Sequence, residues 1–308
     1  MPLDPEIASL VAAWNALDMP RIDSLSAAEW RARYAELERA KVDLPVVAED
    51  RSLSGPGGPI RARLYRPDAR EAVGAFLYLH GGGWVVGSIE SHDERCRRIA
   101  HGASCIVVSI DYRLAPEHPY PAAVEDAYAA AEWLSAEAMK VGSTNARVAV
   151  GGDSAGGNLA AVVALMARDR AGPSFSSQVL VYPAVDHDLG RPSVMENAEG
   201  YLLSRDDMKW YIEQYVPNAI DRNDPYFAPL LAESLAGVAP ALVITAGYDP
   251  LRDEGNAYAV RLEEAGVETE HHCYEGAVHG FLGWSHASAV ARDAVDRIGA
   301  FLRRHLAT

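Results

Sequence analysis

The alternation of short apolar segments with helical stretches most limits how this 308-residue chain can fold. From residue 73 onward, short segments that are apolar almost throughout are separated by longer stretches with helical character. A parallel sheet buries both of its faces beneath crossover helices, so its strands need apolar side chains on both sides. The pattern therefore predicts an α/β fold with a mostly parallel central sheet and helices on both faces.

The predicted strands and helices alternate through most of the chain. Strands are predicted at residues 73–79, 105–110, 147–150, 178–182, 241–246 and 269–274. Helices are predicted at residues 89–102, 121–139, 155–170, 252–265 and 286–306. Ahead of them, residues 46–65 alternate apolar and polar side chains around a turn rich in Gly and Pro, which predicts two antiparallel strands.

Two segments lie outside this alternation. Residues 1–45 have helical character, and Ser26 followed by Glu29 is typical of a capped helix start. A second long segment separates the strand at 178–182 from the next strand, and a plain crossover does not need that length. We therefore expect one large domain over residues 46–308, with a helical cap built from residues 1–45 and an insertion at about 187–220.

Charge and composition exclude several classes of function. Acidic residues outnumber basic ones, 43 against 28, which argues against a nucleic-acid partner because such a partner requires a basic surface. No apolar run reaches the roughly 18 residues that span a bilayer, and the chain start lacks the basic segment of a signal peptide. The three cysteines show no metal or redox spacing. A cytoplasmic protein without a membrane span is expected.

The segment from Gly152 to Gly156 carries a G-x-S-x-G pattern centred on Ser154. It follows a predicted strand and precedes a predicted helix, which is the context of a nucleophile elbow. A turn this sharp holds the serine in a strained conformation, and the flanking glycines let the strand and the helix pass closely. The N–H of Ala155 would then be free to donate to a developing oxyanion. Taken alone, the motif also fits a Gly-rich turn that binds phosphate.

Three glycines follow His80, directly after the predicted strand at 73–79. Backbone N–H groups without side chains beside the serine suit a tetrahedral intermediate. The run is similar to the H-G-G-G loop of lipases and esterases. A phosphate-binding loop is the alternative, but no lysine follows as in a P-loop and no G-x-G-x-x-G opens a helix here.

A serine nucleophile needs a base, and the base needs an acid that orients it. His279 follows the last predicted strand, in the chain order Ser, Asp, His that accompanies the nucleophile elbow. The other histidines considered as the base are expected elsewhere. His80 belongs to the loop of three glycines (the Gly loop), and His271 and His272 lie inside the last strand. Three more are expected on helix surfaces: His101, His286 and His305.

Asp249 is the expected acid, because it follows the apolar strand at 241–246 and catalytic groups gather at the carboxyl ends of such strands. Asp186 follows the preceding strand and is the alternative. Asp153 is expected to be structural. Asp253 and Glu254 fall in the first turn of a predicted helix, where complementing the helix dipole is a sufficient role.

Five motifs in order resemble the hormone-sensitive-lipase family of α/β-hydrolases, in its bacterial esterase branch. They are H-G-G-G-W at 80–84, D-Y-R-L-A-P-E at 111–117, G-D-S-A-G-G at 152–157, D-P-L-R-D-E at 249–254 and H-G-F at 279–281. The resemblance implies Ser154 as nucleophile, His279 as base and Asp249 as orienting acid. It also implies an oxyanion hole formed by the N–H groups of Gly82, Gly83 and Ala155.

The resemblance further implies the activity. Members of the family hydrolyse small esters with short or medium acyl chains, without metal or cofactor, and are often homodimers. We therefore expect a carboxylesterase that acts on a small-molecule ester through an acyl-enzyme. Amide hydrolysis or deacetylation by the same triad stays open. A small-molecule receptor on this scaffold would have lost its catalytic histidine, and the presence of His279 speaks against that alternative.

Overall fold

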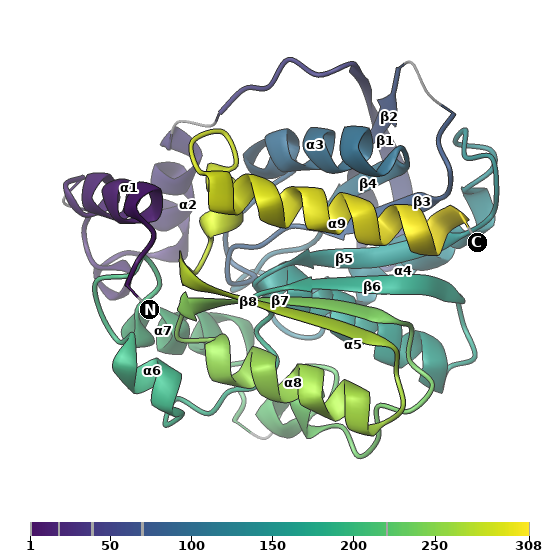
Figure 1. Ribbon diagram of the computed structural model, residues 1–308. Helices are drawn as coiled ribbons and strands as arrows, with labels where there is room; N and C mark the ends of the chain where they lie inside the picture. The colour runs from purple at the N-terminus through teal and green to yellow at the C-terminus, as the bar shows by residue number, and fades with distance from the viewer. Residues whose placement is uncertain (1, 18, 38–39, 69–70, 220, 308) are drawn as a thin grey trace.

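A single eight-stranded sheet forms the centre of the molecule in the computed structural model, which describes residues 2–17, 19–37, 40–68, 71–219 and 221–307. The strand order is β1-β2-β4-β3-β5-β6-β7-β8 (Figure 1). β1 and β2 form an antiparallel hairpin that joins β4 antiparallel, and the remaining neighbours are parallel. The predicted α/β class with a mostly parallel sheet is thereby confirmed.

The strands lie close to the predicted positions. They are β1 Val46–Gly55, β2 Gly58–Pro67, β3 Ala75–Leu79, β4 Ile106–Asp111, β5 Val148–Asp153, β6 Phe175–Val181, β7 Ala241–Tyr248 and β8 Thr269–Val278. β8 continues past its predicted end at Tyr274. The extension arises because Tyr248 of β7 pairs with Val278 beyond a bulge, which restores the ladder near the ends of both strands.

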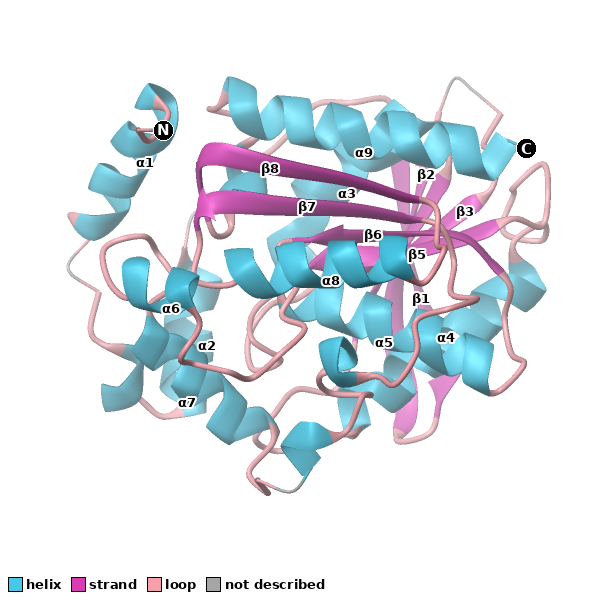
Figure 2. Cartoon of the chain, turned by 60° about the horizontal axis from the view of Figure 1, so that its bottom comes forward, coloured by secondary structure: helices cyan, strands magenta, loops and turns pink. Residues whose placement is uncertain are grey.

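Helices cover both faces of the sheet, as predicted (Figures 1 and 2). α3 Asp93–Ala103 and α9 Ala289–Ala307 lie on one face, and α4 Ala122–Glu137, α5 Ala155–Asp169 and α8 Arg252–Glu264 lie on the other. Each face has its own hydrophobic core. α5 is the most enclosed of these helices, since every residue from Ala155 to Ala167 is buried. Its small apolar side chains allow close contact with both the sheet and α4.

Four further helices lie beyond one end of the strands, away from the helices that cover the sheet (Figure 1). They are α1 Pro5–Asn15, α2 Ala27–Glu36, α6 Pro192–Glu196 and α7 Arg205–Tyr215. α2 begins with the predicted capping box of Ser26 and Glu29, and Ser204 with Asp207 forms an equivalent box on α7. These helices fall within the two segments expected to form the cap. Residues 1, 18, 38–39 and 220 of those segments lie outside the described residues.

The division into a cap and a larger domain stays a prediction. None of the described helices is both long and apolar enough to cross a membrane.

Candidate active site

Ser154 occupies the turn between β5 and α5, with φ 56° and ψ −120°. A side chain rarely adopts this region of the backbone map, so the turn is strained. A Cβ atom at Gly152 would lie 2.2 Å from the carbonyl oxygen of Leu79, and one at Gly156 would lie 1.9 Å from the same atom. Only glycine fits at either position, which is the steric requirement predicted for the elbow.

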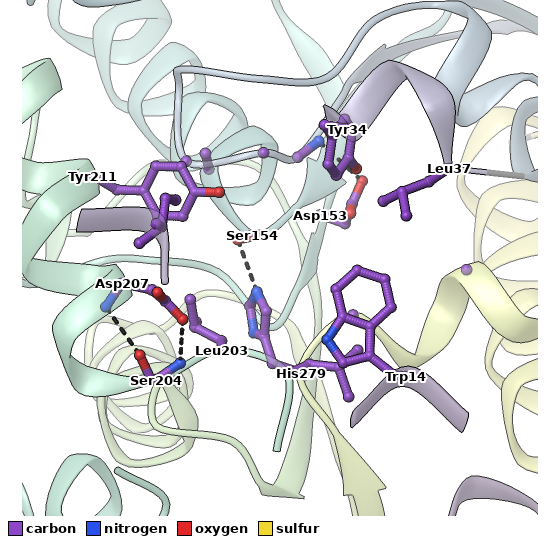
Figure 3. Close-up of a pocket in the computed structure, with 18 of the residues that line it drawn as sticks. Trp14, Tyr34, Leu37, Asp153, Ser154, Leu203, Ser204, Asp207, Tyr211 and His279 are labelled. Carbon is purple, nitrogen blue, oxygen red and sulfur yellow. Dashed lines mark hydrogen bonds between the residues drawn. The ribbon is translucent and has the colours of Figure 1, made fainter. Parts of the chain in front are cut away.

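The structure brings Ser154, His279 and Asp249 together (Figure 3). The Nε2 atom of His279 lies 2.9 Å from the Oγ atom of Ser154, and its Nδ1 atom lies 2.8 Å from the Oδ2 atom of Asp249. The three residues stand at the ends of β5, β8 and β7 or just beyond them, so strands far apart in sequence deliver them to one edge of the sheet. This arrangement suits nucleophilic catalysis by a serine.

Asp186, the alternative acid, is engaged elsewhere. Its carboxylate forms an ion pair with Arg191 and accepts the N–H of His187 at 2.7 Å. Both carboxylates follow a central strand, and the sequence favoured Asp249 with Asp186 as the alternative. In the structure Asp249 is the one that contacts His279.

Glu254 lies in the first turn of α8, as expected, but it does more than complement the helix dipole. It is fully buried, and its Oε1 atom accepts the N–H groups of Val185 and Asp186 at 2.8 and 3.1 Å. Burial raises the pKa of its carboxyl well above the usual value. Glu254 therefore anchors the segment that follows β6. Nothing local in the sequence indicated this contact with residues that are distant along the chain.

His286 is exposed, as expected, but it precedes α9 rather than lying on a helix, and it lines the same cavity as Ser154. His80 is fully buried in the Gly loop, where its ring stacks on Tyr112 at 4.2 Å. His271 and His272 lie on β8 as predicted.

Gly82 and Gly83 lie in the loop after β3, with φ of 122° and 58°. Both residues line the same cavity as Ser154 and Ala155. Within the described part of the chain, neither glycine N–H has a protein hydrogen-bond partner. Unpaired N–H groups in a cavity beside a nucleophile are suited to receive a negative oxygen. The Ala155 N–H opens α5, where the first N–H groups of a helix lack an intrahelical acceptor.

A buried polar network connects the Gly loop to the serine turn. The Asp153 carboxylate accepts hydrogen bonds from Tyr78 at 2.5 Å, from Arg95 at 2.8 Å and from the Gly81 N–H at 3.3 Å. Burial by itself would raise the pKa of Asp153, but the neighbouring Arg95 guanidinium and hydrogen bonds hold it well below its usual range. The Nε2 atom of His92 accepts the same Gly81 N–H at 3.2 Å. Sequence reasoning had not identified His92 or Arg95, because neither belongs to a motif with a known role.

A cavity of about 1010 Å³ opens above Ser154, between the strand ends and the helices α1, α2 and α7. Figure 3 shows Trp14 of α1 on one side of His279 and Tyr211 of α7 on the other. The volume of the cavity is at the upper end of the range that small-molecule sites usually enclose. Among the described residues, no three His, Cys, Asp or Glu side chains are grouped to hold a metal ion.

The known proteins whose sequences resemble this chain are consistent with one another. The family profile of the α/β-hydrolase fold matches residues 76–283. Esterase LipI of Mycobacterium tuberculosis is 44% identical over 272 residues, which cover 87% of this chain and 85% of the relative. Ethyl acetate hydrolase of Pseudomonas putida is 38% identical and covers 99% of this chain and 100% of the relative.

The solved structures that this chain resembles also include esterases. A hyperthermophilic esterase from the archaeon Pyrobaculum calidifontis superposes with a TM-score of 0.89 at 42% identity, covering 100% of both chains. A thermostable esterase from Pseudomonas putida ECU1011 superposes with a TM-score of 0.93 at 33% identity, covering 99% of this chain and 98% of that one. The fold and the turn at Ser154 thus define the class of protein as an α/β-hydrolase. Within that class, the chain belongs to the hormone-sensitive-lipase-like family.

Proposed function

We propose that this chain hydrolyses carboxylic esters of small molecules, with short to medium acyl chains, through an acyl-enzyme on Ser154. The observation that carries the proposal is the 2.9 Å contact between His279 Nε2 and Ser154 Oγ, in a cavity that Gly82 and Gly83 also line. The names of its relatives, which include an esterase and an ethyl acetate hydrolase, support the same substrate class.

In the proposed mechanism, His279 removes the proton from Ser154 as its oxygen attacks the ester carbonyl. Asp249 orients the imidazole and stabilises its positive charge. The N–H groups of Gly82, Gly83 and Ala155 donate to the oxyanion of the tetrahedral intermediate. When the intermediate collapses, His279 passes the proton to the departing alcohol.

The second half of the reaction uses the same groups. His279 accepts a proton from water as the water oxygen attacks the acyl-enzyme carbonyl, and a second tetrahedral intermediate forms in the same hole. Its collapse breaks the bond to Ser154, and the proton returns to the serine oxygen. The products are one carboxylic acid and one alcohol, and the enzyme is regenerated.

The proposed substrate range is the one that the family resemblance implies, and the cavity lining suits it. Apolar side chains of the helices above the serine, including Leu10, Trp14 and Met208, line it and would accept an acyl or alcohol chain. As in the family, activity should be highest with 4-nitrophenyl esters of short to medium chains. A clear preference for very long chains would contradict the assignment of an esterase rather than a lipase.

Ser154→Ala tests the nucleophile directly. We expect turnover to fall by about 10⁴-fold or more, because the residual rate would come from the oxyanion hole and binding alone. Full esterase activity in this variant would refute the proposal. A wild-type protein that binds esters without cleaving them would instead be a receptor, and faster cleavage of matched anilides than esters would indicate an amidase. Cytoplasmic location and a homodimer remain predictions.

A further inference from the structure

Three consecutive residues of the Gly loop are each held by a helix of the predicted cap. These residues are Gly83, Trp84 and Val85, which follow directly on Gly82. We call Gly82–Val85 the oxyanion loop, since this inference rests on the proposed function.

α7 contacts two of these residues with aromatic rings. The ring of Tyr211 lies so close to Gly83 that a Cβ atom there would be 2.2 Å from the Tyr211 Cδ1 atom. The ring of Tyr215 stacks on Trp84, with the centroids 4.6 Å apart and the planes inclined by 8°. Tyr211 and Tyr215 are four positions apart, so they share one face of the helix. That face of α7 therefore lies directly against the oxyanion loop.

α2 reaches the same loop and also holds α7. The Nε atom of Arg31 donates to the carbonyl oxygen of Val85 at 2.7 Å, and its guanidinium also bonds Glu117. The neighbouring Trp30 donates from Nε1 to the Tyr211 hydroxyl at 2.8 Å. Two adjacent residues of α2 thus connect to the loop, one directly and one through Tyr211.

One turn closes the oxyanion loop from within, since the Val85 and Val86 N–H groups donate to the Gly82 carbonyl oxygen at 3.1 and 2.9 Å. These bonds hold the carbonyl side of the turn and leave the N–H groups of Gly82 and Gly83 without a partner among the described residues. Gly82 and Gly83 both have positive φ and lack side chains, so their backbone has more conformations available than that of other residues. An oxyanion hole works only when its donors lie about 2.7–3.1 Å from the oxygen. A displacement of about 1 Å in such a site costs roughly 10²-fold in rate. Contacts from outside the loop therefore add to the turn bonds in keeping the two N–H groups in place.

We propose that α2 and α7 set the geometry of the oxyanion hole, with Arg31, Tyr211 and Tyr215 as positioning residues. The helices then contribute to turnover as well as to substrate binding.

Arg31→Met is the most informative variant, because Arg31 is not among the described residues that line the catalytic cavity. We expect kcat on 4-nitrophenyl butyrate to fall by about 10- to 100-fold while KM stays within about threefold. Arg33→Met is the matched control, since Arg33 is an exposed arginine on the same helix, and it should keep wild-type kinetics.

A second readout separates positioning from general destabilisation. A trifluoromethyl ketone that adds to Ser154 forms a tetrahedral oxyanion, whereas the corresponding alcohol of the same shape forms none. In Arg31→Met, affinity for the ketone should fall by the same factor as kcat/KM, and affinity for the alcohol should be unchanged. If circular dichroism shows that Arg31→Met does not fold, Tyr211→Phe takes its place. It removes only the hydroxyl that accepts from Trp30, and it should show the same ketone-specific loss to a smaller extent.

Each outcome decides the inference. A lower kcat with selectively weaker ketone binding supports it. An increase in KM alone, or equal losses for the ketone and the alcohol, would mean that these residues serve binding or folding only and would overturn it. An active wild type with unaffected variants overturns this inference but leaves the proposed function intact. A wild type that hydrolyses no ester overturns both.

Discussion

The Oδ2 atom of Asp249 lies 2.8 Å from the Nδ1 atom of His279, and its Oδ1 atom accepts the N–H of Leu251 at 2.8 Å. Both oxygens of this fully buried carboxylate therefore have a partner, which offsets the cost of removing the charge from water. The pairing favours the tautomer in which Nδ1 carries the proton and the lone pair of Nε2 faces Ser154. Asp249 consequently fixes both the orientation and the protonation of the proposed base.

Asp249→Asn should retain the fold and lose activity by about 10²- to 10⁴-fold in kcat, because an amide can stabilise the wrong tautomer of His279. Asp186→Asn is the matched control. That carboxylate pairs with Arg191, so its loss should lower stability and leave kcat within about threefold. Steady-state kinetics on one short-chain ester would compare them. A larger loss in the Asp186 variant would identify it as the orienting acid instead.

Gly82→Ala should reduce kcat by about 10²- to 10³-fold, the usual cost of removing one oxyanion donor. The new Cβ atom would lie 2.2 Å from the backbone carbonyl oxygen of Val86, so the loop would have to move. Gly266→Ala controls for backbone strain, because Gly266 also has positive φ but has open space around its Cα. It should lower the melting temperature and spare kcat. Equal activity of the two variants would remove Gly82 from the proposed hole.

His92→Gln should make the free energy of unfolding depend less on pH in the acid range. Burial lowers the pKa of His92 to about 4, with the nearby Arg95 charge acting in the same direction. Between the ordinary value of 6.5 and about 4, the unfolded chain binds this proton more readily than the native protein. The contribution of His92 to the free energy of unfolding is therefore complete above pH 6.5. It declines as the pH falls through that window, by about 3 kcal/mol in all.

Urea unfolding at several pH values between 6.5 and 4 would measure this slope. Glutamine retains a side-chain oxygen that can accept the Gly81 N–H without titrating in this range. The variant should thus lose less stability than wild type on acidification. His101→Gln, a change of the same kind on α3, the helix that follows His92, is the matched control. Identical slopes for wild type and His92→Gln would contradict the prediction.

Anionic esters should be poor substrates. Nine carboxyl residues and two arginines are found among the described residues that line the cavity. Both arginines, Arg21 and Arg95, are already paired with aspartates. Glu90, Glu94 and Asp186 also pair with arginines outside the lining, so the remaining negative potential comes from Glu36, Glu199 and Asp207. It should lower kcat/KM for a hemisuccinate ester by about threefold or more relative to a neutral ester of equal size. Raising the salt concentration should narrow the gap through screening. A gap that is absent at low salt would contradict the prediction.

The sequence by itself determined the class of fold and the place of the nucleophile. Both follow from local physical requirements that leave a direct trace in neighbouring residues. Strands buried on both faces must be apolar throughout, and the turn at Ser154 must have glycine at positions 152 and 156 because the Leu79 carbonyl leaves no room for a Cβ atom. Motif order then pointed to His279 and Asp249.

Only the tertiary structure decided which carboxylate contacts His279, that Glu254 is buried, and that Arg31, Tyr211 and Tyr215 hold the oxyanion loop. These are contacts between residues far apart in the chain. Their distances depend on strand order, on the bulge near the end of β7 and on where α2 and α7 settle over the strand ends. Asp186 and Asp249 both follow a central strand, so strand position alone does not distinguish them, although the motif at 249–254 favoured Asp249. The difference arises from the strand order, because β7, which precedes Asp249, lies next to β8, and His279 directly follows β8.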